Sequence, residues 1–437
     1  METIQQRLRA AAIAVTGADT LPEADGLLRY LGYDDGDATA APGRARMMQA
    51  AASFRRLFRL PVPDAPGLVF FGAEADPARL GPHNAGLPIG GVAGSGLQPK
   101  QAFESCVGEG IEYLSQFADP GDPLVWRTIE AFGERLDAAA NEFLSAVFSA
   151  GGIAADRPVA WVPARRLTDG SECWFPADLC LRRAMPDFVP PLKLSTGCAA
   201  GVTRQDATRH GLLELIERDA VALWWRGGRR PRRIVPDSEA DVTAAELLAH
   251  LRYGQNGRTT SLLDITTDLG IPVVAAFSAR ADGYGFACGL SARTTLAAAA
   301  RSAIFEMCQA ELSLHVIETK RHESGQTALN DSDRRQIARS TMLDTRTCAL
   351  LQPEQAVGAP SEERAGDPVT AIVAALAKHG IVACSLDLTR PRFGVPVMRV
   401  IAPGLQPEPC AIVGERLANM IKETGGGARH SGGIALL

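Results

Sequence analysis

The chain has 437 residues with a formal net charge of −5, and 46% of its residues are hydrophobic. This content supplies a sizeable core and excludes a generally disordered protein, while the weak acidity gives no overall drive toward nucleic acid or an anionic membrane. The nine cysteines are scattered without a Cys-x-x-Cys pair or a zinc spacing with histidine, so buried, reduced thiols are expected. No segment reads as a signal peptide or a membrane span, which predicts a cytoplasmic protein without nucleic-acid or membrane partners.

The N-terminal part is predicted to be helical. Apolar residues recur at helical spacing over residues 4–15, and residues 47–60 are a second candidate helix. We expect residues 1–62 to form a helical accessory segment that packs on the main domain or meets a partner chain. Residues 63–437 are expected to form the main domain.

Strand and helix patterns alternate through the main domain. Residues 67–72 are typical of a buried strand, and residues 158–163 and 172–176 read as paired strands around an Asp-Gly turn. Residues 128–150 carry an apolar stripe at helical spacing. The alternation predicts an α/β protein, with one large domain of helices layered on β-sheet after a short helical N-terminal segment.

Residues 86–96 hold five glycines and lead into a helical pattern. A glycine-rich loop before a helix can cradle a phosphate group. No Gly-Lys-Ser/Thr follows, so this is not a Walker A loop. We expect a loop here, with phosphate binding as one candidate role.

The most informative stretch runs from residue 195 to residue 220. It begins with small residues and continues, after the candidate N-cap Thr203, as a long helical pattern. Glu214 and Glu217 are three apart and therefore neighbours on one face of this helix. Two carboxylates at such a short distance repel each other unless a cation or Arg218 lies between them. Together these features predict an anion-plus-metal site that holds a nucleotide phosphate through Mg²⁺.

The same spacing occurs three times in the chain. Each copy has a loop residue, then an alanine, then two polar residues three apart on the following helix. The copies are Gly96, Ala102, Glu109 and Glu112; Gly201, Ala207, Glu214 and Glu217; and Arg293, Ala299, Glu306 and Gln309. One pair alone would be read as surface glutamates, their usual location. Three pairs in a shared register favour a site, and the three helices could converge on one cation cluster.

Other chemistries lack their motifs. The sequence has no Gly-x-Ser-x-Gly elbow, and its histidines form no pairing with a nucleophile; His210 is the one histidine near the central helix. Phosphoryl transfer needs positioned metal ions and cationic groups rather than a protein nucleophile, so no catalytic nucleophile is assigned. The arginines of residues 226–233 could steer ATP or an acidic peptide, with a solvated loop as the alternative.

At these motifs the chain resembles the YcaO family. The resemblance is carried by residues 105–112 (Ser-Cys-Val-Gly-Glu-Gly-Ile-Glu), 214–219 (Glu-Leu-Ile-Glu-Arg-Asp) and 306–309 (Glu-Met-Cys-Gln), within a similar region from about residue 90 to 404. It implies an enzyme that binds ATP through Mg²⁺ and phosphorylates a backbone amide oxygen of a ribosomally made peptide, in azoline or thioamide formation. It also implies metal ligation by Glu109, Glu112, Glu214, Glu217 and Glu306, and nucleotide contacts by Ser105, Ser195, Arg218 and Gln309.

The peptide-cyclising branch of the family is the most similar, through residues 174–178 (Trp-Phe-Pro-Ala-Asp) and the two tryptophans after the central motif. The resemblance therefore implies an ATP-dependent cyclodehydratase of azole-peptide or bacteriocin biosynthesis. Two features depart from the pattern: Tyr113 stands where the first motif usually has Arg, and the sequence ends in His-Ser-Gly-Gly-Ile-Ala-Leu-Leu rather than a Pro-rich tail. The alternatives are a thioamide-forming enzyme, a non-catalytic nucleotide-binding scaffold, and a plain α/β protein with exposed glutamates.

The resemblance also implies partners. They are a precursor peptide, a separate leader-peptide-binding protein, a flavin dehydrogenase in the same complex, and a second copy of this chain in a homodimer.

Overall fold

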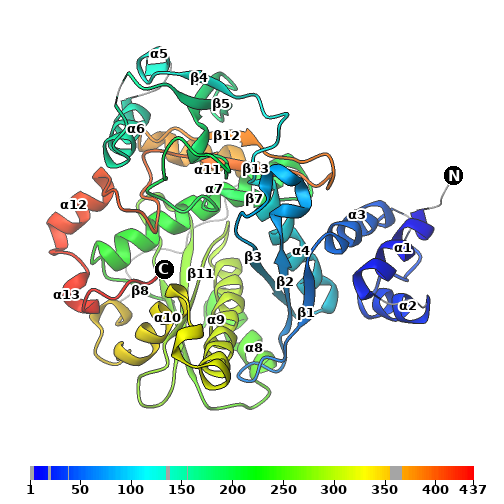
Figure 1. The fold of residues 1–437 in the computed structure, drawn as a ribbon. Coiled ribbons are helices and arrows are strands. Elements are labelled where there is room, and N and C mark those ends of the chain that lie inside the picture. Colours follow the sequence, from blue (N-terminus) through cyan, green and yellow to red (C-terminus); the bar gives the residue numbers. More distant parts are fainter. Residues whose placement is uncertain (1–3, 18–20, 38, 134–137, 155, 355–366) are drawn as a thin grey trace.

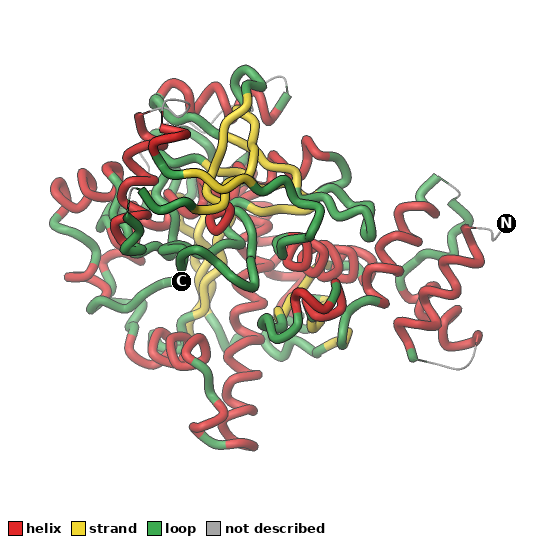
Figure 2. The backbone as a smooth tube through the Cα atoms, turned by 45° about the horizontal axis from the view of Figure 1, so that its top comes forward, coloured by secondary structure: helices red, strands yellow, loops and turns green. Residues whose placement is uncertain are grey.

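The fold contains three antiparallel sheets, and each has an edge strand that leads into a long helix (Figure 1). The computed structural model describes residues 4–17, 21–37, 39–133, 138–154, 156–354 and 367–437. Figure 2 shows the strands in the interior with helices around them. The mixed α/β class predicted from the sequence is confirmed.

The first sheet lies beside the N-terminal helices. Helices α1 (Ile4–Thr16), α2 (Leu21–Tyr30) and α3 (Ala41–Ala52) precede strands β1 (Arg56–Arg59), β2 (Val69–Ala75) and β3 (Gly90–Gly96), which pair in that order, and helix α4 (Pro99–Ser115) follows. The three helices project to one side of the molecule in Figure 1. Tyr33 joins them to α4, because its ring meets Phe103 edge-on at 6.1 Å and its hydroxyl donates to Glu104 at 2.9 Å. The N-terminal helices therefore share a core with α4.

The six-stranded sheet combines strands from distant parts of the chain. It contains β4 (Val125–Arg127), β5 (Val159–Arg166), β6 (Glu172–Pro176), β7 (Cys198–Ala200), β12 (Cys384–Asp387) and β13 (Val397–Ile401), in the order β4-β5-β12-β13-β7 with β6 beside β5. Helices α5 (Glu130–Gly133), α6 (Ala138–Ala150), α7 (Arg204–Val221) and α11 (Pro368–Lys378) accompany it. The strands predicted around the Asp-Gly turn are the paired strands β5 and β6.

The third sheet lies below the six-stranded sheet in the view of Figure 1. Its strands are β8 (Arg232–Arg233), β9 (Thr259–Asp264), β10 (Val273–Ala279) and β11 (Ala287–Ala292), in the order β11-β10-β9-β8. Helices α8 (Glu239–Arg252), α9 (Leu296–Ser324) and α10 (Asp331–Met342) accompany it, and α12 (Glu415–Thr424) and α13 (Ala428–Ser431) follow near the C-terminus. The C-terminal region is fixed to the end of α7, because Arg416 pairs with Asp219 at 2.9 Å.

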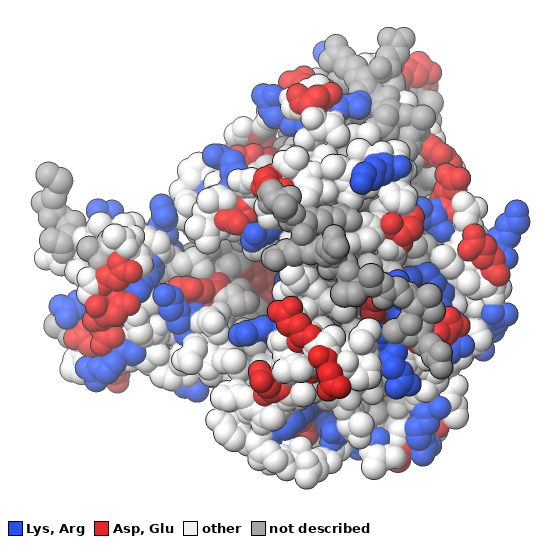
Figure 3. Space-filling view, turned by 180° about the vertical axis from the view of Figure 1, so that it is seen from behind, with Lys and Arg blue, Asp and Glu red and all other residues white. Residues whose placement is uncertain are grey.

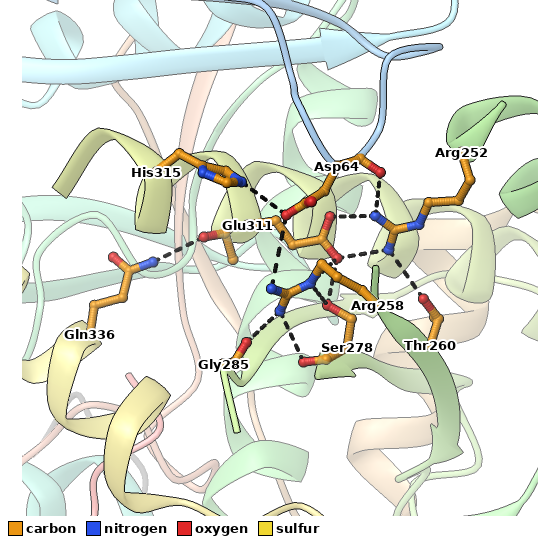
Figure 4. A network of polar contacts seen from close by, with 10 residues as sticks. Asp64, Arg252, Arg258, Thr260, Ser278, Gly285, Glu311, His315 and Gln336 are labelled. Carbon is orange, nitrogen blue, oxygen red and sulfur yellow. Dashed lines mark hydrogen bonds and ion pairs between the residues drawn. The ribbon is translucent and has the colours of Figure 1, made fainter. Parts of the chain in front are cut away.

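A buried ion network joins α8 and α9 to the third sheet (Figure 4). Glu311 of α9 is fully buried and accepts hydrogen bonds from both terminal nitrogens of Arg252 at 2.7 Å, from Arg258 at 3.2 Å and from the Ser278 hydroxyl. A buried charge that loses its partners is costly, so this network fixes the position of α9.

Two predictions about secondary structure are wrong in part. The helix predicted over residues 47–60 ends at Ala52, and residues 56–59 form strand β1. The glycine-rich stretch is not a loop throughout, because residues 90–96 form strand β3. A Cβ atom on Gly94 would lie 2.1 Å from the backbone nitrogen of Cys106, so glycine here lets α4 approach the strand closely. Within the predicted helix 128–150 the structure has α5 and α6, and residues 134–137 between them lie outside the described residues.

Charges of both signs are interspersed over the face shown in Figure 3. In the described ranges, no helix is both long and apolar enough to cross a bilayer.

Candidate functional site

Three edge strands meet at the predicted site. Strands β3, β7 and β11 each end their sheet, so their outward N–H groups have no strand to pair with. Helices α4, α7 and α9 follow these strands and lie against them. Each strand and its helix form one unit, and the three units carry the three sequence copies.

The first polar residue of each copy binds the strand of its own unit or, in the central unit, the residue just before that strand. The N–H of Ala93 donates to Glu109 at 3.0 Å, that of Gly197 to Glu214 at 3.0 Å, and that of Leu290 to Glu306 at 2.9 Å. These bonds satisfy edge amides and hold each carboxylate in a fixed position.

The second polar residue of each copy reaches the strand of the next unit. Glu112 of α4 accepts from the N–H of Ala200, Glu217 of α7 accepts from the N–H of Ala292 at 3.2 Å, and Gln309 of α9 donates to the Ser95 hydroxyl at 2.6 Å. These three contacts close the units into a ring. The shared register found in the sequence is therefore a shared set of contacts.

Local sequence explains how the central unit presents its glutamate. Gly197 has φ +82°, and a Cβ atom there would lie 2.5 Å from the Val400 carbonyl oxygen, so the position requires glycine. Thr203 caps α7 as predicted, because its side chain accepts from the N–H of Asp206 at 3.0 Å. Together they turn the Gly197 N–H toward Glu214 and start the helix that carries it.

The ring encloses a cavity of about 540 Å³. Eight of the nine predicted site residues line it: Ser105, Glu109, Glu112, Glu214, Glu217, Arg218, Glu306 and Gln309. Ser195 is not among the lining residues; it precedes β7, and its carbonyl accepts from the Cys198 N–H at 2.9 Å. His210 also lines the cavity, and its Nδ1 lies 3.2 Å from the Ala200 carbonyl oxygen.

Arg218 lies between two carboxylates, as the sequence predicts. Its terminal nitrogens are 3.4 Å from Glu214 and 3.5 Å from Glu217, and its side chain is 16% exposed. Burial disfavours the charged guanidinium, but Glu217 and Glu214 outweigh burial and raise the pKa of Arg218. A permanent cation therefore holds the two glutamates together on one face of α7.

Burial raises the pKa of four of the five glutamates. The pKa of Glu109 rises to about 7 and that of Glu217 to about 8, and the pKa values of Glu112 and Glu306 are raised as well. Neighbouring carboxylates raise these pKa values further. Glu109 and Glu217 therefore hold protons near neutral pH and would release them to a bound cation, because a cation favours the ionised form.

The donor set fits Mg²⁺ that arrives with a phosphate ligand. Carboxylate oxygens are the ligands that Mg²⁺ takes, and the strand N–H groups use only Oε2 of Glu109 and Glu306. Across the described ranges, however, no three His, Cys, Asp or Glu residues are placed to hold a metal ion, so the glutamates do not form one preformed cation cluster. Mg²⁺ commonly takes one or two carboxylates and completes its shell with phosphate and water. The site therefore suits a metal–nucleotide complex better than a resident metal.

Sequence reasoning missed the roles of Ser95, Ser291 and Arg293, which also line the cavity. Residues two apart lie on the same face of a strand, so reading residues 90–96 as a strand would have placed Ser95 on the same face as Ala93. Tyr113 does not line the cavity, since its hydroxyl donates to the Pro88 carbonyl at 2.6 Å.

The arginines after α7 have internal partners. Arg229 donates to the Thr266 carbonyl at 3.0 Å, and Arg232 donates to Asp264 at 3.0 Å. These two side chains therefore stabilise the third sheet rather than forming a solvated loop.

A second, larger cavity adjoins the first. It has a volume of about 910 Å³ and is bounded by α3, α4, residues 199–202 at the end of β7, and residues 394–396. The two cavities share five lining residues: Ser105, Glu109, Glu112, Ala199 and His210.

Two known proteins are similar to this chain in sequence. A protein in the tfuA 3′ region of Rhizobium leguminosarum bv. trifolii is 28% identical over 330 residues, which cover 72% of this chain and 76% of that protein. A protein of Methanothermobacter thermautotrophicus is 30% identical over 187 residues, covering 42% of this chain and 46% of that protein. Both are described as uncharacterised.

Solved structures share the fold. A heterocyclase in complex with substrate and cofactor has a TM-score of 0.68 at 23% identity, over 89% of this chain and 55% of that one. YcaO from Methanopyrus kandleri, bound with AMPPCP and Mg²⁺, has a TM-score of 0.57 at 19% identity, over 84% and 90%. The E. coli microcin synthetase McbBCD complex with pro-MccB17 bound gives 0.59 at 14%, over 80% and 88%. The chain spans about half the length of the heterocyclase.

Residues 93–406 match the family described as YcaO cyclodehydratase, ATP- and Mg²⁺-binding. The match contains all three helix–strand units except the first residues of β3, and the family's description names ATP and Mg²⁺ as its cofactors. With the ring of glutamates, the fold and this match in agreement, the chain belongs to the YcaO family.

Proposed function

We propose that this protein is an ATP- and Mg²⁺-dependent cyclodehydratase that forms thiazoline or oxazoline rings in a ribosomally made peptide. The observation that carries the proposal is the closed ring in which five glutamates and Arg218 face one cavity. Such a site can bind a metal-bearing polyphosphate without offering a protein nucleophile. Membership of the YcaO family supports the same reaction class.

The reaction exchanges a poor leaving group for a good one. A Cys, Ser or Thr side chain of the peptide loses its proton and attacks the preceding carbonyl carbon, and the former carbonyl oxygen then takes the γ-phosphoryl group of ATP with release of ADP. The carbon–oxygen bond breaks with release of phosphate, the amide nitrogen loses its proton, and the C=N bond of the azoline forms. Bound Mg·ATP supplies the phosphoryl group and offsets the negative charge. The glutamates hold the metal-bearing polyphosphate, while Arg218 keeps Glu214 and Glu217 in place.

The two adjoining cavities support a reaction of two substrates. A nucleotide and a peptide segment must meet at the reacting oxygen, and Glu109 and Glu112 line both cavities. Cavities of roughly 300–1,000 Å³ are of the size that holds a small ligand or a short segment.

We also propose that the peptide is presented by a separate leader-binding chain, with a flavin dehydrogenase in the same complex and a homodimer of this chain. The E. coli microcin synthetase McbBCD complex with pro-MccB17 bound supports a peptide substrate and partner chains by analogy of fold, while the dehydrogenase and the homodimer rest on the family resemblance alone. Product formation by this protein alone would contradict the need for a presenting chain.

Calorimetry with ATP and Mg²⁺, followed by mass spectrometry of a Cys/Ser/Thr-containing precursor peptide, tests the proposed function. We expect Mg²⁺-dependent ATP binding that Glu217→Gln abolishes, and loss of one water per ring formed. Replacement of one oxygen by sulfur would instead identify a thioamide-forming enzyme. Product formation that survives Glu217→Gln would identify a scaffold whose chemistry lies in a partner.

A further inference from the structure

Arg293 breaks the pattern of the three copies at a defined position. Gly96, Gly201 and Arg293 each follow directly the residue that meets a polar side chain of the neighbouring unit. The two glycines are crowded, since a Cβ atom would lie 2.8 Å from Gln101 at Gly96 and 2.4 Å from the Ala207 nitrogen at Gly201. The turns at Gly96 and Gly201 therefore have no room for a side chain. The corresponding turn of the third unit has room for one, and the side chain of Arg293 lies there.

The backbone of Arg293 is fixed, but most of its side-chain donors are not engaged. Its N–H donates to the Pro272 carbonyl at 3.1 Å, and its Nη1 donates to the Ala292 carbonyl at 2.7 Å. Among the described residues, this carbonyl is the one hydrogen-bond partner of the guanidinium, and Glu217 and Glu306 act on it only at longer range. An arginine carries five N–H donors in a planar fork, so several remain for a ligand in the cavity that Arg293 lines.

Arg293 stands at the positive end of a polarised cavity. It precedes α9, and Arg209 and His210, on the first half of α7, are the cationic or titratable groups that interact with it. Glu217 and Glu306 lie further along the same two helices and are the acidic groups that it faces. The partial positive charge of helix N-termini adds to the positive end.

We propose that Arg293 binds the phosphate groups of the nucleotide, as a second fixed cation beside Arg218. This inference rests on the proposed function, because it requires a metal–nucleotide complex in the cavity. The carboxylates take the metal ion and cannot donate to phosphate oxygens, whereas a guanidinium fork matches those oxygens with paired N–H groups. Arg218 is committed to two glutamates, and Arg293 has no such commitment.

The test compares Arg293→Ala, Arg293→Lys and Arg293→Gln with the control Arg321→Ala, which removes the same charge from the exposed far end of α9. Calorimetry measures binding of Mg·ATP, Mg·tripolyphosphate and adenosine. We expect Arg293→Ala to weaken Mg·ATP and Mg·tripolyphosphate by the same factor, about 10- to 100-fold, with adenosine unchanged. Arg293→Lys should give a smaller loss, because it keeps the charge and loses the fork. The control should bind all three ligands as the wild type does.

Arg293→Gln separates a structural role from phosphate binding. It keeps one donor for the Ala292 carbonyl and removes the charge, so it should fold as the wild type and bind Mg·tripolyphosphate as weakly as Arg293→Ala. Wild-type affinity in Arg293→Ala or Arg293→Gln would overturn the inference, as would an equal loss of adenosine binding. Absence of Mg·ATP binding by the wild type would instead overturn the proposed function itself.

Discussion

Glu217→Gln should make the protein more stable while it removes function. Burial raises the pKa of Glu217 to about 8, from an ordinary value near 4.5 in the unfolded chain. A raised carboxyl pKa means that the folded state binds more protons than the unfolded state between these two values. The free energy of unfolding therefore falls as the pH rises from about 4.5 to about 8. Glutamine cannot ionise, so the variant escapes this loss.

The two pKa values set the size of the effect. Compared with a carboxyl group whose pKa does not change on folding, Glu217 lowers the free energy of unfolding by up to about 4 kcal/mol at pH 8. At pH 5 it lowers it by only about 1 kcal/mol. Glutamine keeps a carbonyl oxygen for the Ala292 N–H, and Arg218 keeps Glu214. We therefore expect Glu217→Gln to stabilise the protein at pH 8, by an amount that shrinks toward pH 5.

Urea unfolding at pH 5 and pH 8 measures this difference, and calorimetry with Mg·ATP measures the loss of binding. Glu246→Gln, an exposed carboxylate on α8, is the control and should shift stability by less than about 0.5 kcal/mol at either pH. A Glu217→Gln protein that is less stable than the wild type at pH 8, or whose stability difference does not change with pH, would refute the reasoning.

Three further outcomes follow from the site and the fold. Binding of Mg·ATP at pH 7 should release protons, because the raised pKa values of Glu109 and Glu217 leave both carboxyl groups partly protonated. Equal binding enthalpies in buffers with different heats of ionisation would count against this proton release. Mg²⁺ titrated without nucleotide should bind far more weakly than with AMPPCP, since the described residues offer no three-ligand group. Glu311→Gln should cost roughly 3–5 kcal/mol of unfolding free energy by leaving two arginines buried without their carboxylate, and in the folded fraction Mg·ATP affinity should stay at the wild-type value.

The carboxylate helices could be predicted from sequence because the relevant geometry is local. Residues three apart lie on one helix face whatever surrounds them, so Glu109 with Glu112 and Glu214 with Glu217 were identified as pairs. The Thr203 cap and the ion pairs of Arg218 depend on similarly short spacings. These features can therefore be predicted from the sequence alone.

The ring could not be predicted because it depends on which strands end a sheet. Nothing local marks β7 as an edge, since its neighbour β13 lies almost two hundred residues away. The strand at residues 90–96 was missed for a different reason: its glycines are unfavourable in a strand and are needed there only because α4 packs so closely. The contacts of Arg229 and Arg232 could not be predicted either, because their partners belong to β9 and the turn after it, 37 and 32 residues further along the chain.

The ring of three units is almost symmetric, and the departure from symmetry gives it a direction. Two of its closing contacts use a carboxylate and a strand N–H, whereas the third uses the neutral pair Gln309 and Ser95. Arg293 stands at one of the three corresponding turns, and glycine stands at the other two. Three equivalent corners would let a polyphosphate settle in three equivalent ways. If the cavity binds the nucleotide as proposed, one uncharged corner and one cationic corner would give a chain of phosphates with distinct ends a single preferred orientation, so the same terminal phosphate would face the same wall of the cavity each time.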